Sequence, residues 1–215
     1  MRIIILCVLL ILSSTSCQVL SVPGSLTNVA SGEMLYREDF SNPSSGWNRA
    51  PDETDGFLDY VSGIYRIYVG KVYAMLWAGP GLNFKDVHVE VDITKADGPQ
   101  NDNFGIVCRV VDQNNFYFLV ISDDGYYGIG KVKNGVQQLI GMEAMPPSES
   151  IHQGKVTNHL EGECVGENLT LYVNGNRLSS VRDSEFSKGQ VGIVAGTFGE
   201  PGTDVYFDNF MVLKP

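Results

Sequence analysis

Apolar and polar residues alternate along most of the chain beyond about residue 35. In DVHVEVDIT, residues 86–94, every second position from Val87 to Ile93 is Val or Ile, and the positions between are His, Glu, Asp and Thr. NLTLYV, residues 168–173, follows the same rule. Because successive side chains of a strand point to opposite faces, this period of two predicts strands with one buried face and one outer face.

Turn signals separate the alternating segments. Each pairs a small polar residue with glycine, at Ser62-Gly63, Asp124-Gly125, Asn134-Gly135 and Asn174-Gly175. Such pairs adopt positive φ at little cost, which tight hairpins require. Roughly twelve strands at 8–12-residue spacing, without a helical period, predict an all-β fold: a two-sheet antiparallel jelly-roll sandwich.

One segment is apolar on both faces. Residues 115–122, 126–132 and 136–140 read as three consecutive strands of a meander. In the first, Tyr117, Leu119 and Ile121 alternate with Phe116, Phe118 and Val120. This pattern indicates a central strand that is covered on both sides or has one face lining a groove.

The N-terminus predicts export. Arg2 precedes an unbroken apolar run over residues 3–12, about half the length of a membrane-spanning helix, and small residues lead to Cys17. Small residues ending in Cys indicate a lipoprotein-type signal over residues 1–17, with Cys17 lipid-modified; cleavage elsewhere by ordinary signal peptidase is the alternative. Residues 18–34 are predicted as a flexible tether and residues 35–215 as the jelly-roll domain.

Charge narrows the range of partners. Without residues 1–17 the chain carries 14 Lys and Arg against 25 Asp and Glu, a net charge of −11. So acidic a surface argues against nucleic acid and against electrostatic docking on anionic lipid. Contact with a membrane is therefore expected through the N-terminal lipid only.

Two cysteines remain beyond the predicted signal. The strand period places Cys108 on one face with Phe104, Ile106 and Val110, and Cys164 on the apolar face of its own strand. In an exported chain such cysteines favour a Cys108–Cys164 disulfide, the alternative being two buried thiols. By the same period Val205, Phe207, Met211 and Leu213 share a face of the last strand.

Several segments together resemble a known family. EDFSNPSSGW, ENLTLYVNGNRL, GQVGIVAGTF and VYFDNFMV are similar to the concanavalin A-like, laminin G-type jelly-roll domains of bacterial secreted lipoproteins, to which the 3-keto-disaccharide hydrolase domain family is related. The resemblance covers about residues 35–213. It implies the jelly-roll fold, which serves lectins, carbohydrate-binding modules, glycoside hydrolases and adhesion modules, so function has to come from the site.

A first candidate site is catalytic. Glu90 and Asp92 share a strand face about 7 Å apart. Retaining glycosidases use two carboxyls about 5–5.5 Å apart. Thr94 stands where jelly-roll glycosidases place a third acid. The alternative is a solvated outer face opposite the valines.

A second candidate is a sugar-binding face on the concave sheet. Sugars stack on aromatic planes, and Trp77, Tyr126 and Tyr127 are the candidate rings. Arg109 is expected to pair with Glu90 or Asp92, which are themselves ligand-binding candidates. The alternatives are a core position for the rings and a structural ion pair for Arg109.

A third candidate is a structural calcium that joins the first and last strands, with Asp39 and Asp208 as ligands. From these patterns we expect a lipid-anchored or secreted protein of the bacterial envelope. Its domain is predicted to be a non-catalytic, extracytoplasmic binding module for a glycan. One alternative is a glycoside-hydrolase-like enzyme acting on a sugar derivative; another is a structural or partner-binding envelope lipoprotein.

Overall fold

The computed structural model describes residues 32–52 and 55–215. The predicted signal, Cys17 and nearly all of the predicted tether lie outside this range. The tether was predicted to end too late, at residue 34. The carbonyl of Glu33 already accepts a hydrogen bond from the Lys214 backbone N–H at 2.9 Å, and the first strand begins at Met34.

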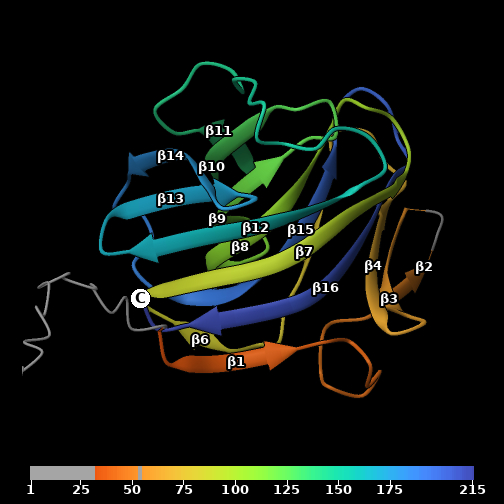
Figure 1. Cartoon of the computed structure of the whole chain (residues 1–215), viewed down its shortest axis with the longest axis horizontal. Coiled ribbons are helices and arrows are strands. Elements are labelled where there is room, and N and C mark those ends of the chain that lie inside the picture. Colours follow the sequence, from red (N-terminus) through yellow and green to blue (C-terminus); the bar gives the residue numbers. More distant parts are fainter. Residues whose placement is uncertain (1–31, 53–54) are drawn as a thin grey trace, which may run out of the picture. The chain divides into compact units, whose positions relative to one another are not determined.

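The described chain forms two antiparallel sheets packed face to face (Figure 1). The nine-stranded sheet has the order β14 (Asn176–Arg182), β13 (Asn168–Val173), β12 (Thr157–Val165), β7 (Val87–Asp97), β16 (Thr203–Leu213), β4 (Ile64–Val69), β3 (Gly56–Val61) and β2 (Ala50–Asp52), with β1 (Met34–Glu38) also on β16. The seven-stranded sheet has the order β11 (Val136–Leu139), β10 (Tyr127–Lys133), β9 (Asn115–Ile121), β8 (Asp102–Asp112), β15 (Gly189–Thr197) and β5 (Met75–Ala78), with β6 (Asn83–Phe84) also on β15.

These sheets confirm the predicted all-β jelly-roll sandwich. The predicted meander is β9, β10 and β11, and Ser62, Asn134 and Asn174 have positive φ in the turns where an Asx- or Ser-Gly pair was expected. The described residues contain more strands than predicted because short edge strands such as β2 and β6 have too few residues to show a period. Within residues 32–52 and 55–215 the structure has no helix long and apolar enough to span a bilayer.

The core lies between the sheets and follows the sequence alternation. Every second residue of β7 from Val87 to Ile93 is buried there, and Leu169, Leu171 and Val173 of β13 are buried likewise. Cys108 of β8 and Cys164 of β12 form the predicted disulfide, which links one sheet to the other. A group of packed aromatic rings, which includes Phe40, Trp47 and Phe210, belongs to this core.

Two bulges shift the strand period. Arg109 (φ 51°) interrupts the pairing of β8, and Asn209 (φ 52°) interrupts that of β16. A bulge inserts one residue and moves the following side chains to the other face. Val110 is therefore not on the Cys108 face as predicted but on the outer face of its sheet. In β16, Phe210 and Val212 fill the core in place of the predicted Met211 and Leu213.

Candidate binding groove

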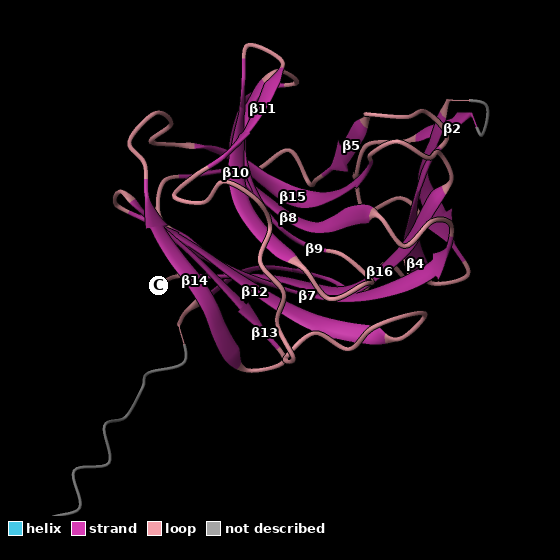
Figure 2. Cartoon of the chain, turned by 90° about the horizontal axis from the view of Figure 1, so that it is seen from above, coloured by secondary structure: helices cyan, strands magenta, loops and turns pink. Residues whose placement is uncertain are grey.

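The seven-stranded sheet is curved, and its outer face is the concave one (Figure 2). A second apolar cluster covers this face, separate from the core between the sheets. It consists of Val107, Val110, Phe116, Phe118, Val120, Val132 and Val194, with Met75, Trp77, Leu139 and Met145 packed against it. Strand β9 thus uses both faces: Tyr117, Leu119 and Ile121 point into the core and its alternate residues into this cluster.

Glycines keep the concave face hollow. A Cβ on Gly130 of β10 would collide with the Phe118 ring and lie 2.6 Å from the carbonyl oxygen of Gln138. A Cβ on Gly128 would lie 3.0–3.1 Å from the side chains of Leu139 and Met145. Because these positions lack side chains, larger neighbours lie flat over β10 and leave open space above the sheet.

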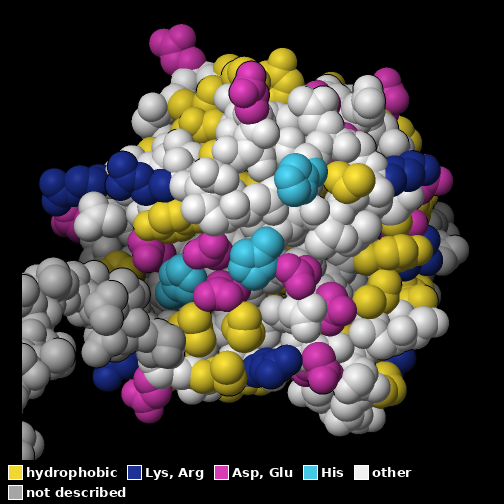
Figure 3. All heavy atoms as spheres, in the orientation of Figure 1, with side chains coloured by type: hydrophobic (Ala, Val, Ile, Leu, Met, Phe, Trp, Pro, Cys, Tyr) yellow, Lys and Arg dark blue, Asp and Glu magenta, His cyan; other side chains and the backbone are white. Residues whose placement is uncertain are grey.

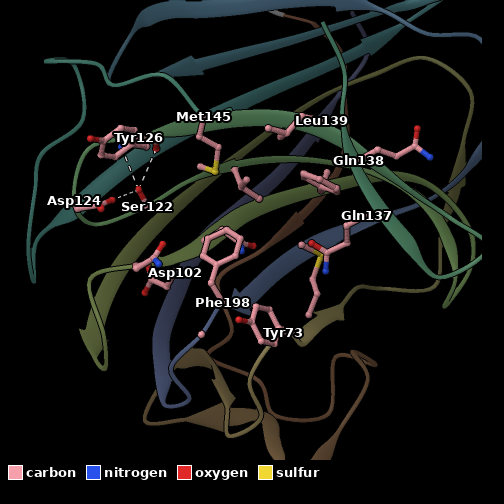
Figure 4. A pocket seen from close by; sticks show the side chains of 16 residues that line it. Tyr73, Asp102, Ser122, Asp124, Tyr126, Gln137, Gln138, Leu139, Met145 and Phe198 are labelled. Atoms are coloured by element: carbon pink, nitrogen blue, oxygen red, sulfur yellow. Dashed lines mark hydrogen bonds between the residues drawn. The ribbon is translucent and has the colours of Figure 1, made fainter. Parts of the chain in front are cut away.

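This space is a groove of about 720 Å³, within the 300–1,000 Å³ typical of small-molecule sites. Rings and apolar chains form its middle, with Phe198 near Tyr73 on one wall and Met145 and Leu139 opposite them (Figure 4). Tyr73 is 76% exposed, and its backbone N–H donates to the carbonyl of Phe198 at 2.9 Å, which ties the two loops of this wall together.

The two ends of the groove are polar. Ser122, Asp124 and Tyr126 mark one end, and the amides of Gln137 and Gln138 mark the other (Figure 4). At the first end the Ser122 hydroxyl donates to the Asp124 carboxylate and accepts from the backbone N–H of Tyr126 at 3.1 Å. These contacts fix the turn that holds the Tyr126 ring at the rim.

Buried charges lie beneath that first end. The Lys95 ammonium donates to the Asp102 carboxylate and, at 2.7 Å, to the carbonyl of Pro99, and the Asp123 carboxylate lies 3.7 Å away. Burial raises the pKa of the Asp102 carboxyl to about 7, although the Lys95 ammonium acts to lower it. Burial likewise raises the pKa of Asp123.

Two oxygen acceptors in the groove lining lack a partner. Oδ1 of Asp102 and Oδ1 of Asn103 are buried and accept no hydrogen bond from the described residues, while the residues themselves are 0% and 3% exposed. Buried polar atoms are nearly always paired, and leaving one unpaired costs about 1–3 kcal/mol. Both atoms are closed off from the groove in this conformation, so a ligand donor would reach them only if neighbouring side chains shift.

The three aromatic candidates for sugar binding lie in different places. Tyr126 lines the groove and is 41% exposed. Trp77 is half-buried against the concave apolar cluster, next to the lining residues but not among them. Tyr127 faces the other way: it packs against the core between the sheets and donates its hydroxyl to the Leu178 carbonyl at 3.2 Å.

Of the two interpretations of Arg109, the structure shows the structural ion pair and not the pairing with Glu90 or Asp92. Its guanidinium is 2% exposed and contacts the carbonyls of Lys85 and Phe186 at 3.1 and 3.0 Å and the Asp86 carboxylate at 3.4 Å, not Glu90 or Asp92. The reason is that Arg109 is on the seven-stranded sheet, whereas Glu90 and Asp92 are on the other sheet. The bulge at Arg109 aims its side chain at loops next to β8, where it has a structural role.

For the catalytic and ligand-binding candidates Glu90 and Asp92, the structure shows the alternative given above, an outer strand face opposite the valines. Both lie on the outer face of the nine-stranded sheet, the side opposite the core-facing valines of β7. Their neighbours are histidines: His88 Nε2 lies 3.1 Å from Glu90 Oε1, and His159 Nδ1 lies 2.7 Å from Asp92 Oδ1. They therefore take no part in the groove.

The candidate calcium ligands have local partners. Asp39 Oδ1 accepts from the backbone N–H and the hydroxyl of Ser41 at 3.0 and 2.6 Å, and Asp208 Oδ1 accepts from the Asn209 N–H at 2.7 Å. Neither belongs to a close group of three metal-ligating side chains in the described part of the chain. Two carboxylates supply only part of the six to eight oxygens that calcium takes, so the calcium stays a prediction.

Sequence reasoning missed most of the groove. Asp102 and Asn103, Leu139, Met145 and Phe198 come from four separate segments, and only the fold brings them together. The signal that was present is the outer set of β9, which is apolar on a face that a simple sandwich would leave to solvent.

Comparisons with known proteins show the fold. No protein-family model and no curated protein matches the chain. Among solved structures it is similar to the carbohydrate-binding module CBM66 from Bacillus subtilis (TM-score 0.53, 20% identity, 84% of this chain and 97% of that one). It is also similar to a protein of unknown function with galectin-like fold from Bacillus subtilis (TM-score 0.60, 13% identity, 86% and 97%).

A third similar structure is the GH43 BlXynB protein from Bacillus licheniformis (TM-score 0.59, 16% identity). The match covers 83% of this chain and 39% of that protein. Identities this low show a shared architecture and nothing finer. The chain has the galectin-like jelly-roll fold, consistent with a concanavalin A-like sandwich, that carbohydrate-binding and glycoside hydrolase domains also use. The narrower likeness to lipoproteins and to the 3-keto-disaccharide hydrolase family stays a prediction.

Proposed function

We propose that this protein is a non-catalytic, extracytoplasmic carbohydrate-binding module whose ligand lies in the concave groove. The observation that carries the proposal is an open groove of about 720 Å³ with rings and apolar chains in its middle and polar side chains at both ends. A pyranose or furanose has the matching chemistry: an apolar face of C–H groups flanked by hydroxyls.

The chemistry of the lining narrows the ligand. Tyr73, Phe198 and Tyr126 offer rings for the C–H face of a sugar, and the Gln137 and Gln138 amides offer donors and acceptors at the far end. Asp124 brings negative charge, and no Lys or Arg of the described residues lines the groove. Acidic glycans would be repelled, so the expected ligand is a neutral oligosaccharide of a few residues.

Location outside the cytoplasm rests on the N-terminal export signal and on the Cys108–Cys164 disulfide. Disulfides persist in oxidising compartments, which agrees with secretion. The lipid anchor at Cys17 would hold the domain at the envelope, where glycans are abundant.

A glycan array followed by calorimetry tests the proposal. We expect a neutral oligosaccharide to bind the full mature chain, and Tyr73→Ala combined with Tyr126→Ala to weaken binding about 5- to 150-fold, because ring contacts contribute about 0.5–1.5 kcal/mol each. Tyr206→Ala on the nine-stranded sheet is the matched control, since Tyr206 is half-buried and outside the groove. A folded protein that binds no saccharide, or a double variant that binds as the wild type does, would refute the proposal.

A second candidate function, a hydrolase, is favoured by one observation: a carboxyl in the groove, that of Asp102, has a pKa near 7, as a general acid requires. Incubating the bound oligosaccharide with the protein and following its mass separates the two functions. Intact ligand after many hours supports binding alone. Cleavage that Asp102→Asn abolishes would assign an enzyme.

A further inference from the structure

The outer face of the nine-stranded sheet carries a compact group of histidines and carboxylates. Three residues come from each of two neighbouring strands, and we call them the histidine–carboxylate block: His88, Glu90 and Asp92 of β7, and His159, Glu161 and Glu163 of β12. They face each other across the strands as His88 with Glu163, Glu90 with Glu161, and Asp92 with His159. Figure 3 shows histidine and acidic side chains gathered on this face.

The block has excess negative charge. Its four carboxylates lie within 4.0 Å of its two imidazoles, and in residues 32–52 and 55–215 no Lys or Arg forms a salt bridge with any of them. The side chains of His88, Glu90 and Glu161 are only 16%, 20% and 23% exposed. Like charges directly across a sheet are destabilising, and partial burial strengthens their repulsion. A bound cation would remove this cost.

The His88 imidazole lies from each of two carboxylates at about the spacing of neighbouring zinc ligands. His88 Nε2 lies 3.1 Å from Glu90 Oε1 and 3.6 Å from Glu161 Oε2, and the three side chains offer atoms within 4.8 Å of one another. Zn²⁺ binds imidazole and carboxylate at about 2.0–2.2 Å, so neighbouring ligands of a tetrahedral site lie about 3.4 Å apart. Oxygen-only ions do not call for the imidazole.

The surroundings orient these ligands as protein metal sites do. His88 Nδ1, the nitrogen that would face away from the ion, lies 3.5 Å from Glu163 Oε1. A carboxylate in that place can accept a hydrogen bond from Nδ1–H, which favours the tautomer whose Nε2 lone pair can bind a metal in place of its present 3.1 Å contact with Glu90. On the other side, Glu90 Oε2 lies 3.7 Å from His159 Nε2, and Asp92 holds that ring through Nδ1 at 2.7 Å.

We infer that His88, Glu90 and Glu161 bind a divalent first-row transition metal of the zinc type, with Glu163 and Asp92–His159 as the outer shell. Three protein ligands leave one tetrahedral position for water. The site is on the sheet opposite the groove and shares no residue with it. It also differs from the predicted calcium site at Asp39 and Asp208.

Zinc titration of the tag-free mature chain tests this inference. After dialysis against chelator we expect one Zn²⁺ per chain by calorimetry, a rise in melting temperature, and tetrahedral absorption bands when Co²⁺ replaces Zn²⁺. Glu161→Gln keeps the shape of the side chain and removes the charge, and should weaken zinc binding at least tenfold. Glu163→Gln, which leaves all three ligands in place, should weaken it about 10- to 100-fold through the outer shell.

The matched control combines His152→Asn with Glu149→Gln, which removes one exposed histidine and one exposed carboxylate outside the block. Its zinc affinity should equal that of the wild type. If the wild type binds no zinc, or if Glu161→Gln binds it equally well while melting as the wild type does, the inference is wrong. Neither outcome bears on oligosaccharide binding in the groove.

Discussion

The two outer faces of this sandwich come from the same alternating pattern and have opposite chemistry. On β9 the outward residues Phe116, Phe118 and Val120 are apolar and 1–4% exposed. On β7 the outward residues are histidine and carboxylates, which stay partly exposed. The outer face at β9 is therefore hidden from solvent, although neither sheet of the described residues packs over it. The outer face at β7 resembles the solvated face of an ordinary antiparallel sheet.

Curvature explains the difference. The concave face shields its own apolar residues, because β11 and the loop that carries Met145 form a raised edge along it. The glycines of β10 leave room for a ligand. The face of β7 has no such walls, so its residues must tolerate water. An apolar surface that the fold itself does not cover marks an interaction site.

The largest effect is expected from the bond that joins the two sheets. Cys108 and Cys164 are 56 residues apart, and the chain-entropy model gives such a loop about 4 kcal/mol of stabilisation. The double variant Cys108→Ala/Cys164→Ala should therefore lose about that much free energy of unfolding in urea. Adding reductant to the wild type should reproduce the loss and leave the variant unchanged. Equal stability of the two proteins would mean that the sheets hold together without this bond.

The next largest effect compares one glycine substitution in each of the two sheets. Gly130→Ala places a Cβ against the Phe118 ring and a backbone carbonyl, so we expect a loss of about 2–3 kcal/mol and weaker ligand binding. Gly162→Ala on β12 is the comparison: its Cβ would meet the Ile106 side-chain end at 3.3 Å, which can move slightly, and should cost less than 1 kcal/mol. Chemical denaturation of both variants measures the difference. Equal costs would show that the groove floor is no more tightly packed than the core.

The sequence predicts the fold well because alternation and turn chemistry are local. Neighbouring residues alone predict the buried face of Val87 to Ile93 and the Asn134-Gly135 turn. The disulfide was predicted from two inward-facing cysteines in a chain that is expected to be exported. The exceptions are also instructive. Val110, Met211 and Leu213 were assigned to the wrong face because single residues, Arg109 and Asn209, bulge out of their strands. A bulge has no clear signature when the bulged residue is not glycine.

The site was less predictable because strand order is not written in any one segment. The outward residues of β7 and β8 belong to different sheets although the strands are consecutive, so Arg109 and Glu90 cannot meet. Glu90 and Glu161 do lie opposite each other on neighbouring strands. They are far apart in the sequence, and the alternating pattern does not show which strands pair. Knowing which strands are neighbours would have revealed both the groove and the histidine–carboxylate block.

The smallest predicted effect is a pH dependence that distinguishes the buried end of the groove. Asp102 has a pKa of about 7 in the folded state against about 3.9 unfolded, so between these values the folded protein holds a proton that the unfolded chain has released. Stability should then fall as pH rises from 5 to 6.5, by at most about 1.4 kcal/mol per pH unit. Urea midpoints across this range measure the slope, which should be shallower in Asp102→Asn.

The pH dependence of stability is more informative than its value at one pH, because Asp102→Asn also removes a partner of Lys95 and lowers stability at every pH. Asp123, whose pKa burial also raises, keeps a residual slope of the same sign. Asp59 provides the contrast from the other sheet: the Arg49 guanidinium lowers the pKa of its carboxyl, so its contribution is lost only as the pH falls below about 4. Asp59→Asn should therefore leave the slope between pH 5 and 6.5 unchanged. A wild-type slope of zero would mean that the Lys95 ammonium keeps Asp102 ionised in the folded protein throughout this range.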